Sequence, residues 1–86
     1  MVFVCADATY TYPYHTISRW VLTPSATDTL RVHAGEDEVT IRGRNLHAIC
    51  YALGTARLRV LRATNDRYQT QPDAVFVSRI SVERLS

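Results

Sequence analysis

The order of apolar and polar residues along the chain predicts mostly β-strands. The clearest pattern covers residues 29–42, where two alternating runs flank the segment Ala34–Asp37, which contains a glycine and two acids. Alternation on both sides of such a segment is typical of a β-hairpin with a loop of about four residues and one face in the core. The apolar positions are Leu30, Val32, Val39 and Ile41, and the polar positions between them are Arg31, His33, Thr40 and Arg42.

Four further stretches are rich in β-branched, aromatic and other apolar residues, and they also predict strands. They are residues 1–5, 15–22, 56–63 and 74–83. In the third stretch, Leu58 and Val60 alternate with Arg57 and Arg59, so we expect the two apolar residues to face the core. A cluster of turn formers at residues 23–28, with room for one helical turn, and a polar loop at residues 64–73 separate the strands.

The last predicted strand changes character along its length. Its first half, Val75-Phe76-Val77, is apolar on both faces, which predicts a central position in a sheet. Its second half alternates: Ile80 and Val82 lie on one face, and Arg79, Ser81 and Glu83 lie on the other.

Residues 43–54 are the one segment with a helical period. Asn45 is placed to cap the start, and Gly54 is placed where a left-handed residue would end the helix. So short a helix needs a sheet to pack on. The apolar stripe consists of Leu46, Ile49, Cys50 and Leu53, at positions i, i+3, i+4 and i+7.

Together these elements predict a single α+β domain over residues 1–86. We expect two layers: a mostly antiparallel sheet of about five or six strands, with the short helix packed on one of its faces. Apolar residues make up 47% of the chain and charged residues 21%, which is the composition of a folded protein. With 86 residues the core is small.

Composition also bears on the compartment. No apolar run approaches the ~18 residues that cross a bilayer, and the first ten residues lack the basic flank and long apolar region of a signal peptide. Two cysteines, Cys5 and Cys50, are too few for a disulfide framework, and each lies among apolar residues. We therefore expect a cytoplasmic protein with buried thiols and no membrane partner.

The sequence YTYPYH, residues 10–15, places three tyrosines at alternating positions around Pro13. Tyrosine rings can stack on bases, pack within the chain, or contact another protein. Proline confines this segment to a sheet edge or a loop, where contact surface or packing within the chain is favoured over a base platform. The residues that we expect at an interface are Tyr10, Tyr12, Tyr14, Trp20, Val75 and Val77, with Trp20 and one of the valines on the outer face of the sheet.

All ten basic residues are arginine, and the net charge is only +2. A genome rich in GC explains the absence of lysine, and so small a charge does not demand a polyanionic partner. A solvated outer sheet face is the commoner explanation of alternating arginines, yet these residues, with the helix start, could also bind a small anion or nucleic acid. The candidates are Arg31, Arg42, Arg44, Asn45, Arg57 and Arg59.

No motif for catalysis, a cofactor or a metal is present. His47 and Cys50 have a spacing that can hold a metal edge, but the paired ligands of a structural zinc site are missing. The chain has no glycine-rich phosphate loop and no nucleophile motif. We therefore expect neither enzyme activity, nor a cofactor, nor a metal.

Three functional hypotheses remain open. The first is a non-catalytic interaction module that forms a homodimer, because a small core and exposed aromatics favour burial against a second copy. The second is a binder of single-stranded nucleic acid that uses arginine and tyrosine. The third is a carrier of a small anion or ligand, with its site at the start of the helix.

Overall fold

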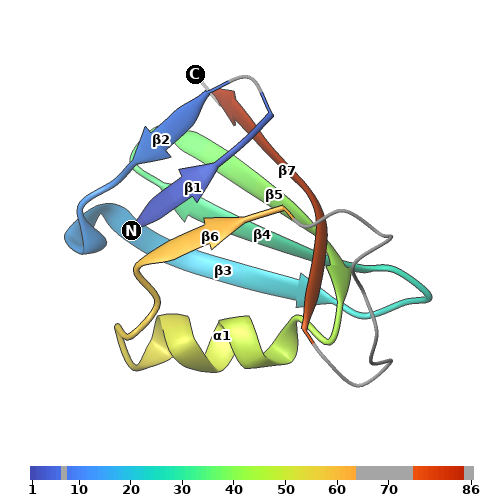
Figure 1. The fold of residues 1–86 in the computed structure, drawn as a ribbon. Helices are drawn as coiled ribbons and strands as arrows, with labels where there is room; N and C mark the ends of the chain where they lie inside the picture. The colour runs from blue at the N-terminus through green and yellow to red at the C-terminus, as the bar shows by residue number, and fades with distance from the viewer. Residues whose placement is uncertain (7, 64–74, 85–86) are drawn as a thin grey trace.

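The computed structural model describes residues 1–6, 8–63 and 75–84 and shows two β-sheets and a helix (Figure 1). The three-stranded sheet, in the order β2-β1-β6, lies across the four-stranded sheet, in the order β3-β4-β5-β7. The strands are β1 (Val2–Val4), β2 (Thr9–Thr11), β3 (Ile17–Thr23), β4 (Asp28–Ala34), β5 (Asp37–Arg44), β6 (Val60–Arg62) and β7 (Phe76–Arg84). The helices are the 3₁₀ helix η1 (Tyr14–Thr16) and α1 (His47–Gly54).

The predicted α+β class is confirmed, but the prediction of one sheet of five or six strands is wrong. β1 pairs with β2 antiparallel and with β6 in parallel, so these three strands form a sheet of their own. The physical reason is coverage of the core. A helix of eight residues is about 12 Å long, too short to cover a sheet whose last strand has nine residues. The small sheet buries the remainder.

The core lies between the two sheets and α1. In the four-stranded sheet, residues in register share a face, and two rows of apolar side chains point inward. The small sheet contributes Phe3 and Leu61, which are directly paired. The buried cluster is Phe3, Leu30, Val32, Val39, Ile41, Leu46, Ile49, Leu53, Leu61, Val77 and Ile80.

The hairpin of β4 and β5 is confirmed, with a tighter turn than expected. The strands run to Ala34 and from Asp37, so only Gly35 and Glu36 connect them. Gly35 has φ +61° at the first central position, where two-residue hairpins of type II′ carry glycine.

Trp20 differs from its predicted place, and of the two valines only Val75 is exposed. Trp20 lies opposite the fully buried Val32, so its ring is on the inner face and not on the outer one. Val77 is also inward, 4% exposed, opposite Gly43. Val75, which precedes β7, is 46% exposed.

The expectation that β7 is a central strand is wrong, because β7 is the last strand of its sheet among the described residues. Its apolar start has two local causes. Val77 points into the core at a bulge, and the ring of Phe76 lies under the guanidinium of Arg44, with 5.3 Å from Cζ to the ring centroid. Arginine over an aromatic face is a favourable cation–π contact.

The predicted orientation of β6 is also wrong. Val60 is 47% exposed, and the neighbouring Leu61 points into the core. The strand pairs in parallel with β1 rather than joining the larger sheet, and the pair Phe3–Leu61 sets which residue faces inward. Leu58, ahead of the strand, still packs against the core as expected.

Both ends of α1 differ from the sequence prediction. Asn45 has φ +58° and does not occupy the cap position, which is Leu46. Gly54 is the last helical residue, and the left-handed residue is Ala56, φ +56°. The N–H groups of Ala56 and Arg57 donate to the carbonyls of Leu53 and Ala52, respectively, which is a Schellman motif.

Two other predictions concern connections. Residues 24–27 contain bends and no helical turn. The polar loop predicted at residues 64–73 lies outside the described residues.

Candidate functional site

Two of the three tyrosines pack within the chain. Tyr12 contacts Phe3 edge to face, with ring centroids 5.9 Å apart, and its hydroxyl donates to Oδ2 of Asp37 at 2.7 Å. Tyr14 lies in η1, because the chain turns at Pro13, and its hydroxyl donates to the carbonyl of Leu58. These contacts favour packing within the chain over a base platform or an interface.

Tyr12 is also electrostatically distinct. Burial, and then the hydrogen bond to the Asp37 carboxylate, raise the pKa of its hydroxyl well above the ordinary value. Tyr12 therefore stays protonated over the whole physiological range, as a hydrogen-bond donor that fixes β2 to the β4–β5 hairpin. Tyr10 is half-buried opposite Phe3 and lies at the end of the sheet nearer β7.

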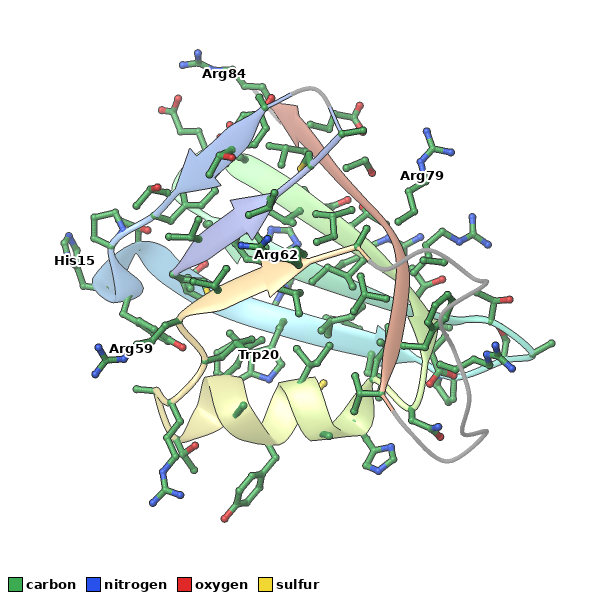
Figure 2. The ribbon with its side chains drawn as sticks, viewed as in Figure 1. His15, Trp20, Arg59, Arg62, Arg79 and Arg84 are labelled. Carbon is green, nitrogen blue, oxygen red and sulfur yellow. The ribbon has the colours of Figure 1, made fainter. Side chains whose placement is uncertain are left out.

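The predicted anion-binding arginines do not share one surface. Arg31, Arg42 and Arg44 lie on the outer face of the four-stranded sheet, because they alternate along β4 and β5 with the residues that point inward. Arg57 and Arg59 lie in the connection between α1 and β6, and Figure 2 shows Arg59 just ahead of the small-sheet strand β6. The prediction placed them together because it assigned residues 56–63 to the larger sheet.

The start of α1 already has an anion from the chain itself. The N–H of Leu46 donates to Oδ2 of Asp28 at 3.3 Å, and the N–H of Ser25 donates to Oδ1 at 3.3 Å. The Asp28 carboxylate therefore accepts from the Leu46 N–H, a backbone donor that a bound anion near Asn45 would have used.

The outer face of the four-stranded sheet is divided by charge. Nearest the β4–β5 turn, one row across the sheet contains Arg19, His33, Glu38 and Glu83. Within that row, His33 Nε2 lies 3.3 Å from Oε2 of Glu38. At the other end, Arg42 lies opposite Arg79, and the same row holds only threonines besides. Figure 2 shows Arg79 extending away from the sheet.

β5 and β7 therefore contain two like-charge pairs in direct register, Arg42 with Arg79 and Glu38 with Glu83. Like charges directly opposite each other destabilise a sheet. Among the described residues, Arg79 and Glu83 form no ion pair that would offset this; the nearby Arg84 pairs with Glu36 at 2.9 Å. β7 is thus charged in a pattern that its own sheet does not neutralise.

A groove of about 350 Å³ runs beside β7. Five consecutive residues of that strand, Ser78–Val82, line it, together with Ala6, Tyr10 and Ala63 from the small sheet and its flanks. No described strand pairs with this edge of β7. The groove, the unpaired edge and the unneutralised charges coincide on one element, and together they form the candidate site.

The predicted metal-edge pair, His47 and Cys50, lies on α1. The described residues contain no group of three or more His, Cys, Asp or Glu side chains that could hold a metal ion. His47 is exposed and Cys50 is half-buried on α1, and burial raises the pKa of the Cys50 thiol, which leaves it a weak nucleophile. No helix within the described ranges is long and apolar enough to span a membrane.

The sequence contained part of the signal for this site. The alternation of Arg79, Ser81 and Glu83 is visible in the sequence and predicts one polar face. What could not be deduced is that β7 pairs with β5, since that pairing alone puts Arg42 and Glu38 opposite residues of the same charge.

Comparisons of this chain with protein-family models, with curated proteins and with solved structures find no match.

Proposed function

We propose that this chain is a non-catalytic, cytoplasmic interaction module that self-associates as a homodimer. The observation that carries the proposal is the edge of β7, a nine-residue strand with a groove along it, which no described strand pairs with. An unpaired edge exposes a row of N–H and C=O groups that can pair with another chain. Cys5 and Cys50, which are not joined by a disulfide, fit a reducing compartment.

The middle of the β7 edge, from Arg79 to Val82, lacks several of the features that normally prevent pairing. Protected edges are short, carry proline or inward-pointing charges, or are twisted by bulges. β7 has no proline, and Ile80 and Val82 on its inner face are apolar, whereas Arg84 at the end of the strand is exposed. Its register shift lies at the start of the strand, near Ser78, so the pairing is regular from Arg79 to Arg84.

The other edge of the same sheet is a poorer candidate. β3 has seven residues, and its pairing with β4 is interrupted by a shift between Ile17 and Arg19. The helix α1 also contacts β3, and Trp20 reaches toward Gly54, where an added Cβ would lie 3.8 Å from Cζ2 of the ring. Self-association through β7 is favoured for these reasons.

Sedimentation velocity over a series of concentrations tests the proposal. We expect a monomer at low concentration and a species of twice the chain's mass at high concentration, in reversible exchange. A single monomeric species at every concentration would contradict the proposal. A series of larger species without a dimer would contradict it as well, because a closed two-fold contact ends at two copies.

A second candidate function is binding of single-stranded nucleic acid. Its supporting observation is that Arg42, Arg44 and Arg79 lie together at one end of the outer face, where the residues in register with them are Thr29 and Phe76. Three phosphate contacts would give a slope of about −2 in a plot of log K against log salt concentration. Titration of a single-stranded oligonucleotide measures it, and Arg44→Ala should weaken binding without altering the sedimentation of the free protein.

A further inference from the structure

The outer face of β7 is charged symmetrically about one residue. Arg79 lies two positions before Ser81, and Glu83 lies two positions after it. Each charged residue faces a like charge on β5, whereas Ser81 faces Thr40. If two copies of this strand pair antiparallel in the right register, Arg79 of each copy therefore lies opposite Glu83 of the other.

Symmetry leaves few registers. When two antiparallel edges join about a two-fold axis, the axis is perpendicular to the sheet and both copies keep the same face outward. A residue must then pair with one on the same face, so the axis passes through a residue and never between two residues. An axis at Arg79 or at Glu83 would place identical charges opposite each other, and an axis at Ile80 or Val82 would give neither charge a partner of opposite sign.

An axis at Ser81 satisfies both faces. On the outer face, Arg79 lies opposite Glu83 of the partner subunit, and the reciprocal pair forms by symmetry. On the inner face, Ile80 lies opposite Val82 of the partner subunit, so apolar side chains meet beside the groove. Opposite-charge and apolar cross-strand pairs are the ones that stabilise antiparallel sheets.

From these relations we infer that two copies pair antiparallel through the free edges of β7, with Ser81 on the two-fold axis. The inference rests on the proposed self-association and specifies its interface. The two four-stranded sheets become one continuous sheet of eight strands. One row of the outer face then contains, in order, Arg42, Arg79, the partner's Glu83 and the partner's Glu38. The two arginines of one copy therefore lie beside the two glutamates of the other.

Charge reversal tests the register. Arg79→Glu and Glu83→Arg, each alone, place two like-charge pairs across the axis, and we expect the dimer dissociation constant to rise about tenfold or more. The double variant, Arg79→Glu with Glu83→Arg, restores opposite charges at both places. We expect its dissociation constant to return to within about threefold of wild type.

The same variants separate interface effects from folding effects. Within one copy, Arg79→Glu removes the repulsion with Arg42, and Glu83→Arg removes the repulsion with Glu38. Each single variant should therefore unfold at an equal or higher denaturant concentration than wild type, measured under conditions where all three are monomeric. Weaker dimerisation by a more stable fold supports the inference, whereas weaker dimerisation by a destabilised fold contradicts it.

Cross-linking gives an independent check of the axis. In a dimer centred on Ser81, the two copies of Ser81→Cys lie directly opposite and should form an intermolecular disulfide on mild oxidation. Thr40→Cys is the matched control, because it lies in the same row one strand away from the edge. Wild type controls for the native Cys5 and Cys50. We expect covalent dimer from Ser81→Cys and not from the two controls.

The outcomes are distinguishable. Suppose that wild type dimerises, but charge reversal does not change the dimer dissociation constant and Ser81→Cys forms no covalent dimer. The proposed self-association is then correct, but the interface through β7 is wrong. If wild type is monomeric at every concentration, both are wrong.

Discussion

The two sheets of this protein are held together in different ways. In the four-stranded sheet, β4 pairs with β5 over seven residues and β5 pairs with β7 over eight. In the small sheet each pairing covers three residues, a length at which hydrogen bonds alone give marginal stability in water. The large sheet is stabilised mainly by long backbone pairing, whereas the small sheet is stabilised mainly by burial of Phe3 and Leu61.

This difference also bears on where the proposed interface lies. The small sheet contributes its inner face to the core, and its strands are too short to offer a long edge. The large sheet ends in the long strand β7, whose outer edge no described strand pairs with and whose charges the sheet does not balance. The following predictions test whether the small sheet depends on burial and the large one on backbone register.

The largest effect is expected for Phe3→Ala. Phe3 is fully buried between the sheets and contacts Tyr12. Removing a buried phenylalanine side chain costs about 3–5 kcal/mol, a large share of the stability of a chain of this size. Denaturant unfolding measures the loss, and hydrogen exchange should show that amides of β1 and β6 lose protection before those of β4 and β5.

Val60→Ala is the control for Phe3→Ala. Val60 lies in the same small sheet but points outward, so its truncation should change stability by less than about 0.5 kcal/mol. Equal effects of the two substitutions would show that the small sheet does not depend on its buried face.

Gly43→Ala should disrupt the large sheet through its backbone. A Cβ atom at Gly43 would lie 1.8 Å from the carbonyl oxygen of Phe76, so β5 and β7 would have to separate at the bulge. We expect a loss of about 3 kcal/mol or more in the free energy of unfolding, together with loss of the dimer. Gly35→Ala is the comparison, since it meets no atom within 4 Å and has only an unfavourable φ, for which we expect about 1 kcal/mol.

Tyr12→Phe tests the polar link between the sheets. It removes the hydrogen bond to Asp37 and retains the ring, and a bond to a charged acceptor contributes about 1.5–3 kcal/mol when buried. Because Tyr12 is only partly buried, we expect the lower part of that range. Tyr10→Phe, whose hydroxyl has no hydrogen bond with the described residues, should have little effect.

The same pair gives a pH dependence with a defined sign. The pKa of Tyr12 is raised in the folded protein, so its stabilising effect is complete below the unfolded value of about 10 and decreases as pH rises above it. The stability difference between wild type and Tyr12→Phe should therefore be constant at neutral pH and shrink in alkaline solution. A difference that grows above pH 10 would contradict the assignment.

The smallest effect is expected for Ala56→Gly, in the connection between the sheets. Ala56 adopts φ +56° at the end of α1, which costs an alanine about 1–2 kcal/mol. Glycine adopts that conformation freely but loses more entropy on folding, so we expect a net gain of about 0.5–1 kcal/mol. Ala52→Gly, in the helix interior, should have the opposite sign, and thermal unfolding of the two compares them directly.

The sequence predicted the features that depend on neighbouring residues. The β4–β5 hairpin and the apolar stripe of α1 follow from alternation and helical period, and the α+β class follows from their sum. Pairings between distant segments could not be predicted, because alternation alone does not identify the partner of a strand. For that reason the division into two sheets, the inward direction of Leu61 and the edge position of β7 all differed from expectation.

The candidate site shows the same limit. Arg79, Ser81 and Glu83 could be assigned to one face from the sequence, but their charges become informative only beside Arg42 and Glu38, which the fold places opposite them. For the tyrosines, the sequence left open both contact with another chain and packing within the chain. Pro13 does interrupt the strand, as expected, yet the turn that follows directs Tyr14 back to the chain, toward Leu58.

The parallel pairing of β1 with β6 has a consequence for how the protein is made. β1 leaves the ribosome well before β6, while the β4–β5 hairpin can close as soon as its second strand emerges. Contacts between distant segments form slowly, because the intervening chain must be ordered first. The short apolar segment Val2–Val4 therefore pairs with β6 only after the β4–β5 hairpin has had time to form.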